Sequence, residues 1–132
     1  MSYFYLDTSV VVHALLGHSN SAAEWLDKTS ADESNLLFSS RVLRTELTRV
    51  LRREGLPIAT RDEVLDFIGL IPLTEAILIA AEAIVPPVKT LDAIHLASVI
   101  GSGLDATIVT HDAAMTAAAY TIGYPVFDPI VE

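Results

Sequence analysis

The sequence predicts an α/β domain of three layers, in which a mostly parallel sheet lies between two layers of helices. The first observation is that short apolar segments alternate along the chain with segments of helical periodicity. The second is length: 132 residues without a repeat or linker predict a single domain, residues 1–132. The third is composition, because 52% hydrophobic and 19% charged residues are typical of a compact globule.

Short β-prone segments supply the predicted strands, which begin with the aromatic run YFYL. The predicted strands cover residues 3–6, 36–40, 70–74, 106–110 and 125–127. The predicted helices cover residues 9–17, 21–28, 41–55, 61–68, 75–85, 91–103 and 112–123. Hydroxyl side chains precede three of these helices, so we expect caps from Thr8 or Ser9, from Ser39 or Ser40, and from Thr74.

Charge and cysteine content restrict the classes of function. The net charge of −9 argues against a protein that merely coats nucleic acid, since such proteins are usually basic. The absence of cysteine excludes a disulfide framework, a cysteine-based zinc site and a thiol nucleophile. The amino terminus has no basic region before Lys28, and no segment resembles a membrane span, so we expect a cytoplasmic protein without membrane contact.

All six arginines fall between residues 41 and 61. One interpretation is the solvated face of a helix, and the other is a patch that binds phosphate or a partner. The arginines that we consider for contact with RNA or a partner are Arg41, Arg44, Arg49 and Arg53.

Four carboxylates are predicted to meet at one edge of the sheet. Asp7 directly follows the first strand, and Asp112 follows the strand at 106–110 by two residues. Glu46 and Asp92 lie on the inward faces of their helices, because apolar residues flank both at helical spacing. Ligands of open α/β sheets gather at the carboxyl ends of the strands, so this edge is the candidate site.

Each acid taken singly also has a structural explanation. Asp92 and Asp112 suit the first turn of a helix, Asp7 suits a helix cap, and Glu46 suits an ion pair with Arg49 or Arg53. Together, converging carboxylates repel one another unless a cation or shared protons offset the repulsion. Oxygen ligands without cysteine favour a hard cation such as Mg²⁺ or Mn²⁺, which also bridges to phosphate.

The stretches around these acids resemble the PIN-domain ribonucleases, and among them the VapC toxins of prokaryotic toxin–antitoxin pairs. The stretches are YLDTSVVV around Asp7, SRVLRTELTRVLRREG around Glu46, LDAIHLASV around Asp92 and IVTHDAAM around Asp112. They span almost the whole chain in the family's order, and the set is more specific than any single stretch.

The resemblance implies a five-stranded parallel sheet sandwiched by helices, and an endoribonuclease that depends on Mg²⁺ or Mn²⁺. It also implies a homodimer inhibited by a small VapB-like antitoxin. Carried over, Asp7, Glu46, Asp92 and Asp112 would be the acids of the metal site. In the mechanism that we expect, Asp7, Asp92 and Asp112 hold the metal directly or through water, and Glu46 orients the water that attacks the RNA phosphodiester. The hydroxyls of Thr8, Ser9 and Thr110 would support these acids.

Other interpretations remain. The chain could be a PIN-fold nuclease outside toxin–antitoxin systems, or an inactive binding or assembly module that keeps the fold. A phosphatase of the haloacid dehalogenase type needs a second aspartate where Ser9 stands, and a response-regulator receiver needs one where Thr74 stands. His95 and His111 lie next to the proposed acids, where a packed or supporting role is favoured over a direct one.

Overall fold

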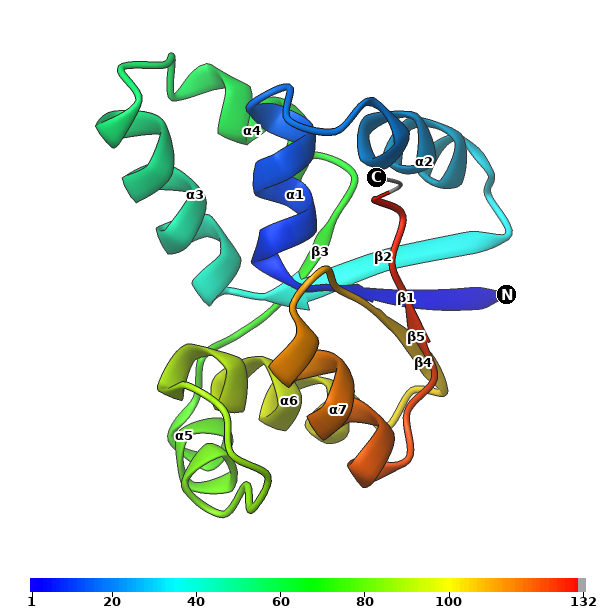
Figure 1. Cartoon of the computed structure of the whole chain (residues 1–132), viewed down its shortest axis with the longest axis vertical. Helices are drawn as coiled ribbons and strands as arrows, with labels where there is room; N and C mark the ends of the chain where they lie inside the picture. Colours follow the sequence, from blue (N-terminus) through cyan, green and yellow to red (C-terminus); the bar gives the residue numbers. More distant parts are fainter. Residues whose placement is uncertain (131–132) are drawn as a thin grey trace.

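The computed structural model describes residues 1–130 and contains a sheet of five parallel strands in the order β3-β2-β1-β4-β5 (Figure 1). The strands are β1 (Ser2–Leu6), β2 (Asn35–Ser40), β3 (Gly69–Ile71), β4 (Ala106–Val109) and β5 (Val126–Phe127). Every pairing between neighbouring strands is parallel. The predicted three-layer α/β architecture is confirmed, and its sheet is parallel throughout the described residues.

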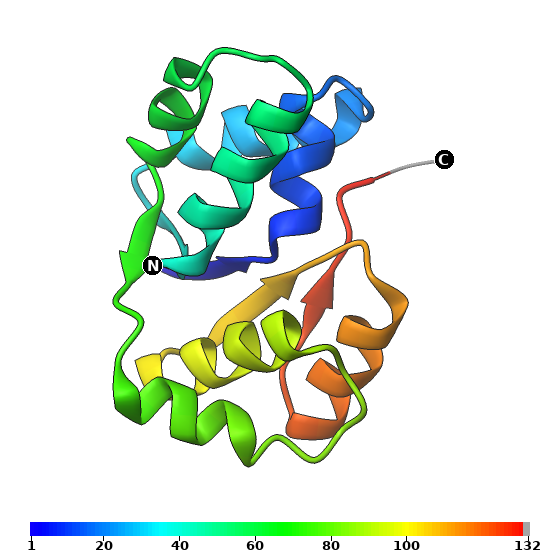
Figure 2. The same ribbon diagram turned by 90° about the vertical axis from the view of Figure 1, so that its left-hand side faces the viewer.

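The helices form the two outer layers. They are α1 (Thr8–Leu15), α2 (Asn20–Ala31), α3 (Val42–Arg53), α4 (Ala59–Leu65), α5 (Glu75–Glu82), α6 (Thr90–Ser102) and α7 (Ala113–Ile122). Helices α1 to α4 cover one face of the sheet, and α5 to α7 cover the other, as both views show (Figures 1 and 2). Within residues 1–130, no helix combines the length and apolar character that crossing a membrane requires.

The alternation of side chains along β1 creates two cores. Phe4 and Leu6 face the layer of α1 to α4, where Leu6 packs among buried residues such as Leu43 and Leu47 of α3. Tyr3 and Tyr5 face the opposite layer, with Leu96 of α6 and residues of α7. Because successive residues of a strand point to opposite faces, the short run YFYL supplies both layers at once.

Two details differ from the sequence predictions. Strand β3 ends at Ile71 instead of residue 74, because Pro72 has no N–H to donate to a strand ladder. The expected cap of α1 is wrong, since Asp7 holds the N-cap position and the Thr8 and Ser9 hydroxyls donate to carboxylates. At α3 the N-cap position belongs to Arg41, but the expected Ser40 hydroxyl does accept the N–H of Val42, at 3.1 Å, where the helix begins. The cap from Thr74 is confirmed, because its hydroxyl accepts a hydrogen bond from the N–H of Ile77.

The strand order places the ends of β1 and β4 side by side. β1 pairs with β2 on one side and with β4 on the other, so the chain order reverses beside β1. The Asp7 N–H donates to the carbonyl of Val109 at 2.9 Å, which joins the residue just beyond β1 to the last residue of β4. This reversal is where ligands bind in open α/β sheets, so the fold brings Asp7 next to the segment Thr110–Asp112.

Truncation of Leu6 tests the core that supports this edge. Leu6 is 0% exposed, so Leu6→Ala leaves a cavity directly behind Asp7 and should lower the free energy of unfolding by about 2–5 kcal/mol. Leu36→Ala on β2 is the matched control, because Leu36 is 39% exposed and should cost far less. Urea unfolding followed by circular dichroism measures both, and equal losses would contradict this description of the core.

Candidate active site

A cavity of about 270 Å³ lies at the carboxyl edge of the sheet, and all four predicted acids line it. Asp7 comes from the end of β1, Glu46 from α3, Asp92 from the first turn of α6, and Asp112 from the start of α7. The remaining lining residues are Thr8, Ser9, Val12, His13 and Val50. Side chains that lie far apart in the sequence, from Asp7 to Asp112, therefore converge on one cavity.

Asp7 is a buried carboxylate held by two hydroxyl groups. Its side chain is nearly inaccessible, and its Oδ2 accepts hydrogen bonds from Thr110 at 2.7 Å and from Ser9 at 3.0 Å. A buried charge needs such donors to offset the loss of hydration. Thr110 itself does not line the cavity, so its place in the site is one of support for Asp7.

Glu46 reaches from α3 toward α1 and α6. Its Oε1 accepts a hydrogen bond from the Thr8 hydroxyl at 2.8 Å and lies 3.1 Å from Nε2 of His95. The alternative of an ion pair with Arg49 or Arg53 is wrong, because within residues 1–130 the ion-pair partner of Glu46 is His95, and Arg53 Nε donates to Glu54 at 3.3 Å. The Thr8 hydroxyl, which was expected to cap α1, therefore donates to Glu46 of α3.

Asp92 and Asp112 differ in how their carboxylates are held. Burial, followed by repulsion from Asp7 and Asp112, raises the pKa of Asp92 to about 6. Asp112 caps α7, since its Oδ1 accepts the N–H of Met115 at 2.7 Å. Asp112 therefore both caps the start of a helix and lines the cavity.

The histidines occupy distinct places. His95 is 1% exposed and packs between Tyr5 and Glu46, whereas His111 donates from Nδ1 to Asp128 at 2.8 Å. His13 lines the cavity, which the sequence analysis missed, and its Nδ1 donates to the carbonyl of Ser9 at 2.7 Å. The four-residue spacing of Ser9 and His13 on one helix face was the available signal.

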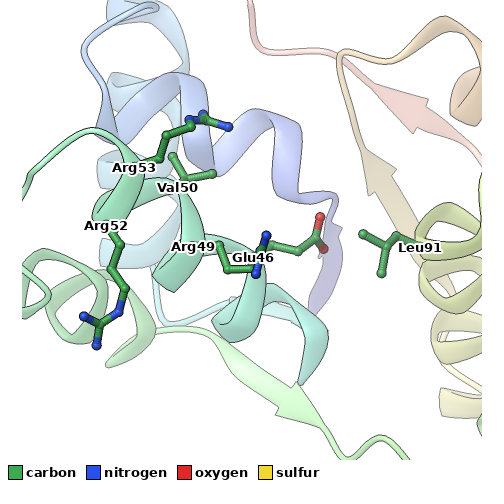
Figure 3. A pocket seen from close by; sticks show the side chains of 6 residues that line it. All are labelled: Glu46, Arg49, Val50, Arg52, Arg53 and Leu91. Carbon is green, nitrogen blue, oxygen red and sulfur yellow. The ribbon is translucent and has the colours of Figure 1, made fainter.

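A larger groove of about 510 Å³ adjoins the acidic cavity and shares Glu46 and Val50 with it. Its other lining residues are Arg49, Arg52, Arg53 and Leu91. Figure 3 shows the Glu46 carboxylate directed across the gap toward Leu91 of α6, and Arg52 extending away from it. We call this the arginine groove. Of the predicted contact residues, Arg49 and Arg53 line the groove, and Arg41 and Arg44 line a neighbouring hollow.

Comparison with known proteins identifies the family. The PIN domain model matches residues 4–119, which is most of the chain. This chain belongs to the PIN domain family. The PIN-domain chain is also 31% identical over 131 residues to a protein named Ribonuclease VapC47 from Mycobacterium tuberculosis, with 95% of this chain and 96% of that protein covered.

Solved structures share the PIN fold at low sequence identity. A toxin–antitoxin complex from Klebsiella pneumoniae matches with a TM-score of 0.71 at 17% identity, and 100% of both chains is covered. VapBC-1 from nontypeable Haemophilus influenzae has a TM-score of 0.70 at 14% identity. VapBC2 from Rickettsia felis, solved with a promoter DNA fragment, has a TM-score of 0.67 at 15% identity. Each match covers 96% of this chain and 98% of the other. These likenesses support the fold.

The oxygen donors of the PIN-domain cavity fit a hard divalent cation. Carboxylates from separate elements surround one space, and their repulsion contributes to the raised pKa of Asp92, which a cation would relieve. Within residues 1–130, no three His, Asp or Glu side chains already stand in an arrangement that holds a metal ion. Like charges without a cation between them stay apart, so small movements or bridging waters would complete such a site.

The raised pKa of Asp92 predicts a stability that depends on pH. Its pKa of about 6 in the folded protein lies above the ordinary value of 3.8, so the contribution of Asp92 to stability is fully present below pH 3.8 and is lost as the pH rises through about 6. Without divalent ions, Asp92→Asn should therefore raise the melting temperature at pH 7.5 by about 5 °C. At pH 4 the gain should vanish.

Calorimetry with a chelator present measures this difference. Asp27→Asn is the matched control, because Asp27 is an exposed carboxylate of α2 that does not line the cavity. An Asp92→Asn gain of equal size at pH 4 and pH 7.5 would contradict the repulsion among these acids.

Proposed function

We propose that this chain is a divalent-metal-dependent endoribonuclease that acts as the toxin of a toxin–antitoxin pair. The observation that carries the proposal is the convergence of four carboxylates on one cavity, at the end of β1, on α3, on α6 and at the start of α7. Similarity along nearly the whole chain to Ribonuclease VapC47 supports RNA as the substrate. The match to toxin–antitoxin complexes supports a VapB-like antitoxin as the partner.

The residues of the cavity divide the chemistry between them. Asp7, Asp92 and Asp112 would hold Mg²⁺ or Mn²⁺, directly or through water. The ion would supply positive charge that offsets the charge developing on the phosphodiester and eases loss of a proton from water. Glu46 would orient the attacking water and take its proton at Oε2, since both of its hydrogen bonds fall on Oε1. Ser9 and Thr110 hold Asp7 in place.

The arginine groove would carry the RNA strand next to the scissile bond. Arg49 and Arg53 lie one and two turns beyond Glu46 on α3, and their groove opens into the acidic cavity. Positive side chains beside an acidic site can hold flanking phosphates while the acids act on one of them. This arrangement reconciles a net charge of −9 with a polyanionic substrate.

The remaining parts of the proposal concern assembly and location. Exposed apolar side chains on and around α5, namely Leu73, Ile79 and Val85, support a homodimer through this part of the molecule. An RNA substrate and an antitoxin partner favour the cytoplasm as the place of action.

Removal of one carboxylate tests the site. Asp7→Asn or Asp92→Asn should reduce Mn²⁺-dependent RNA cleavage by about a hundredfold or more, because each substitution takes one anionic ligand from the cavity. Cleavage of a labelled RNA by the purified protein measures the rate, and circular dichroism checks the fold. Asp27→Asn is again the control and should cleave at the wild-type rate.

The outcomes separate the competing functions. Wild-type rates in both cavity variants would overturn the site assignment, and a folded wild-type chain that cleaves no RNA with Mn²⁺ would favour an inactive binding module. Expression of the wild-type chain should arrest bacterial growth, whereas Asp7→Asn should not. RNA cleavage in vitro without growth arrest would favour a PIN-fold nuclease outside toxin–antitoxin systems.

Neutralisation of the arginine groove tests the RNA path. The double variant Arg49→Ala/Arg53→Ala should raise KM for RNA about tenfold and lower the slope of log affinity against log salt by about 0.7 for each phosphate that is no longer neutralised. Its kcat should change much less, because neither arginine lies at the acidic cavity. Arg41→Ala/Arg44→Ala, in the neighbouring hollow, removes the same charge and should have a smaller effect. Equal effects of the two double variants would contradict a path through the arginine groove.

A further inference from the structure

His95 lies deep in the site and connects Tyr5, which is buried, with Glu46, which lines the cavity. Its Nδ1 lies 2.8 Å from the hydroxyl of Tyr5, and its Nε2 lies 3.1 Å from Glu46 Oε1 and 3.1 Å from the Thr8 hydroxyl. The imidazole is 1% exposed and Tyr5 is equally buried. A polar ring in this position must satisfy both of its nitrogens within the protein.

Counting protons determines which nitrogen of His95 carries hydrogen. Thr8 has a single hydroxyl proton, which it donates to Glu46 Oε1 at 2.8 Å. The Glu46 carboxylate can only accept, so Nε2 has no donor among its two neighbours and must itself donate. In a neutral imidazole Nδ1 is then the acceptor, and the Tyr5 hydroxyl donates to it.

Tyr5 is suited to this donor role. Burial raises the pKa of its hydroxyl above the ordinary value of 10.0, so the phenol keeps its proton across the neutral range. The ring of Tyr5 packs edge-on against Phe38 and His95, with centroids 5.3 and 5.7 Å apart. The hydroxyl is therefore held in place by its own packing as well as by the hydrogen bond.

Both hydrogen bonds on Glu46 fall on the same oxygen. Thr8 and His95 meet at Oε1, and within residues 1–130 no hydrogen bond to Oε2 is formed. Glutamate has a long, flexible side chain that samples many rotamers when it is not held. Two donors on Oε1 thus fix the side chain and leave Oε2 as the oxygen available to the cavity that Glu46 lines.

We propose that Tyr5 and His95 form a positioning pair, in which the Tyr5 hydroxyl fixes the Nε2–H tautomer of His95 and that N–H holds Glu46 for the reaction. The catalytic consequence rests on the function proposed above for Glu46, whereas the tautomer does not. Nε2 also lies 3.9 Å from Asp7 Oδ1, so its N–H lies between two of the converging carboxylates. Neither Tyr5 nor His95 touches substrate, because neither lines the cavity.

Tyr5→Phe is the variant that tests the pair, because it removes one oxygen and keeps the packed ring. Nitrogen-15 NMR of the histidine rings in the metal-free protein reads the tautomer directly. The wild type should show His95 protonated at Nε2 alone, and Tyr5→Phe should show a mixture of tautomers. Tyr3→Phe is the matched control, since Tyr3 lies two residues earlier on the same strand and faces the same layer.

Cleavage kinetics add a second readout. Tyr5→Phe should lower kcat about tenfold, the size expected when one hydrogen bond is lost in the transition state, and should leave KM for RNA unchanged. His95→Gln, whose amide can still donate to Glu46, should retain more of kcat than His95→Leu, which cannot. A merely structural role for His95 would give these two variants equal rates.

The results separate this proposal from the function it rests on. A wild-type His95 protonated at Nδ1, or a Tyr5→Phe variant with the wild-type tautomer and kcat, would overturn the positioning pair. If the wild type shows the Nε2–H tautomer and cleaves no RNA, the hydrogen-bond pair stands and the catalytic assignment of Glu46 fails.

Discussion

Repulsion among four carboxylates around one cavity is the constraint on which the rest of the site depends. Three of the acids each have one oxygen held by donors from the protein. Two hydroxyls hold Asp7, a hydroxyl and an imidazole hold Glu46, and a backbone N–H holds Asp112. These bonds fix the carboxylates at the cavity that all three residues line. Asp92 carries the unrelieved part of the repulsion, which contributes to the rise of its pKa.

The parallel sheet makes this convergence possible at a low conformational cost. Each crossover returns the chain to the same edge, so residues at the ends of β1 and β4 become neighbours although about a hundred positions separate them. Helices α3 and α6 pack on opposite faces of the sheet, and each directs one acid over the edge. The site therefore needs both outer layers, and neither half of the chain could build it alone.

Local pattern was sufficient to predict the elements and the acids, because apolar periodicity and strand ends are read within short windows. Local pattern did not predict the hydrogen-bond partner of a side chain that had two possible partners. Thr8 was expected to cap α1, yet its hydroxyl bonds Glu46, which comes near only after folding. His13 was missed although its spacing from Ser9 was available, because the cavity that it lines forms only when distant segments meet. The partners of these side chains depend on tertiary contacts, which a short window of sequence does not contain.

Helix α3 combines the two opposite charge requirements of an enzyme that acts on a polyanion. Its Glu46 faces the acidic cavity, while Arg49 and Arg53 line the adjoining groove. Because consecutive helical turns lie about 5.4 Å apart, one helix can present a carboxylate and cations close together along one side. The tertiary fold has to bring only the other three acids to Glu46, and the path that we propose for RNA then follows from the sequence of α3.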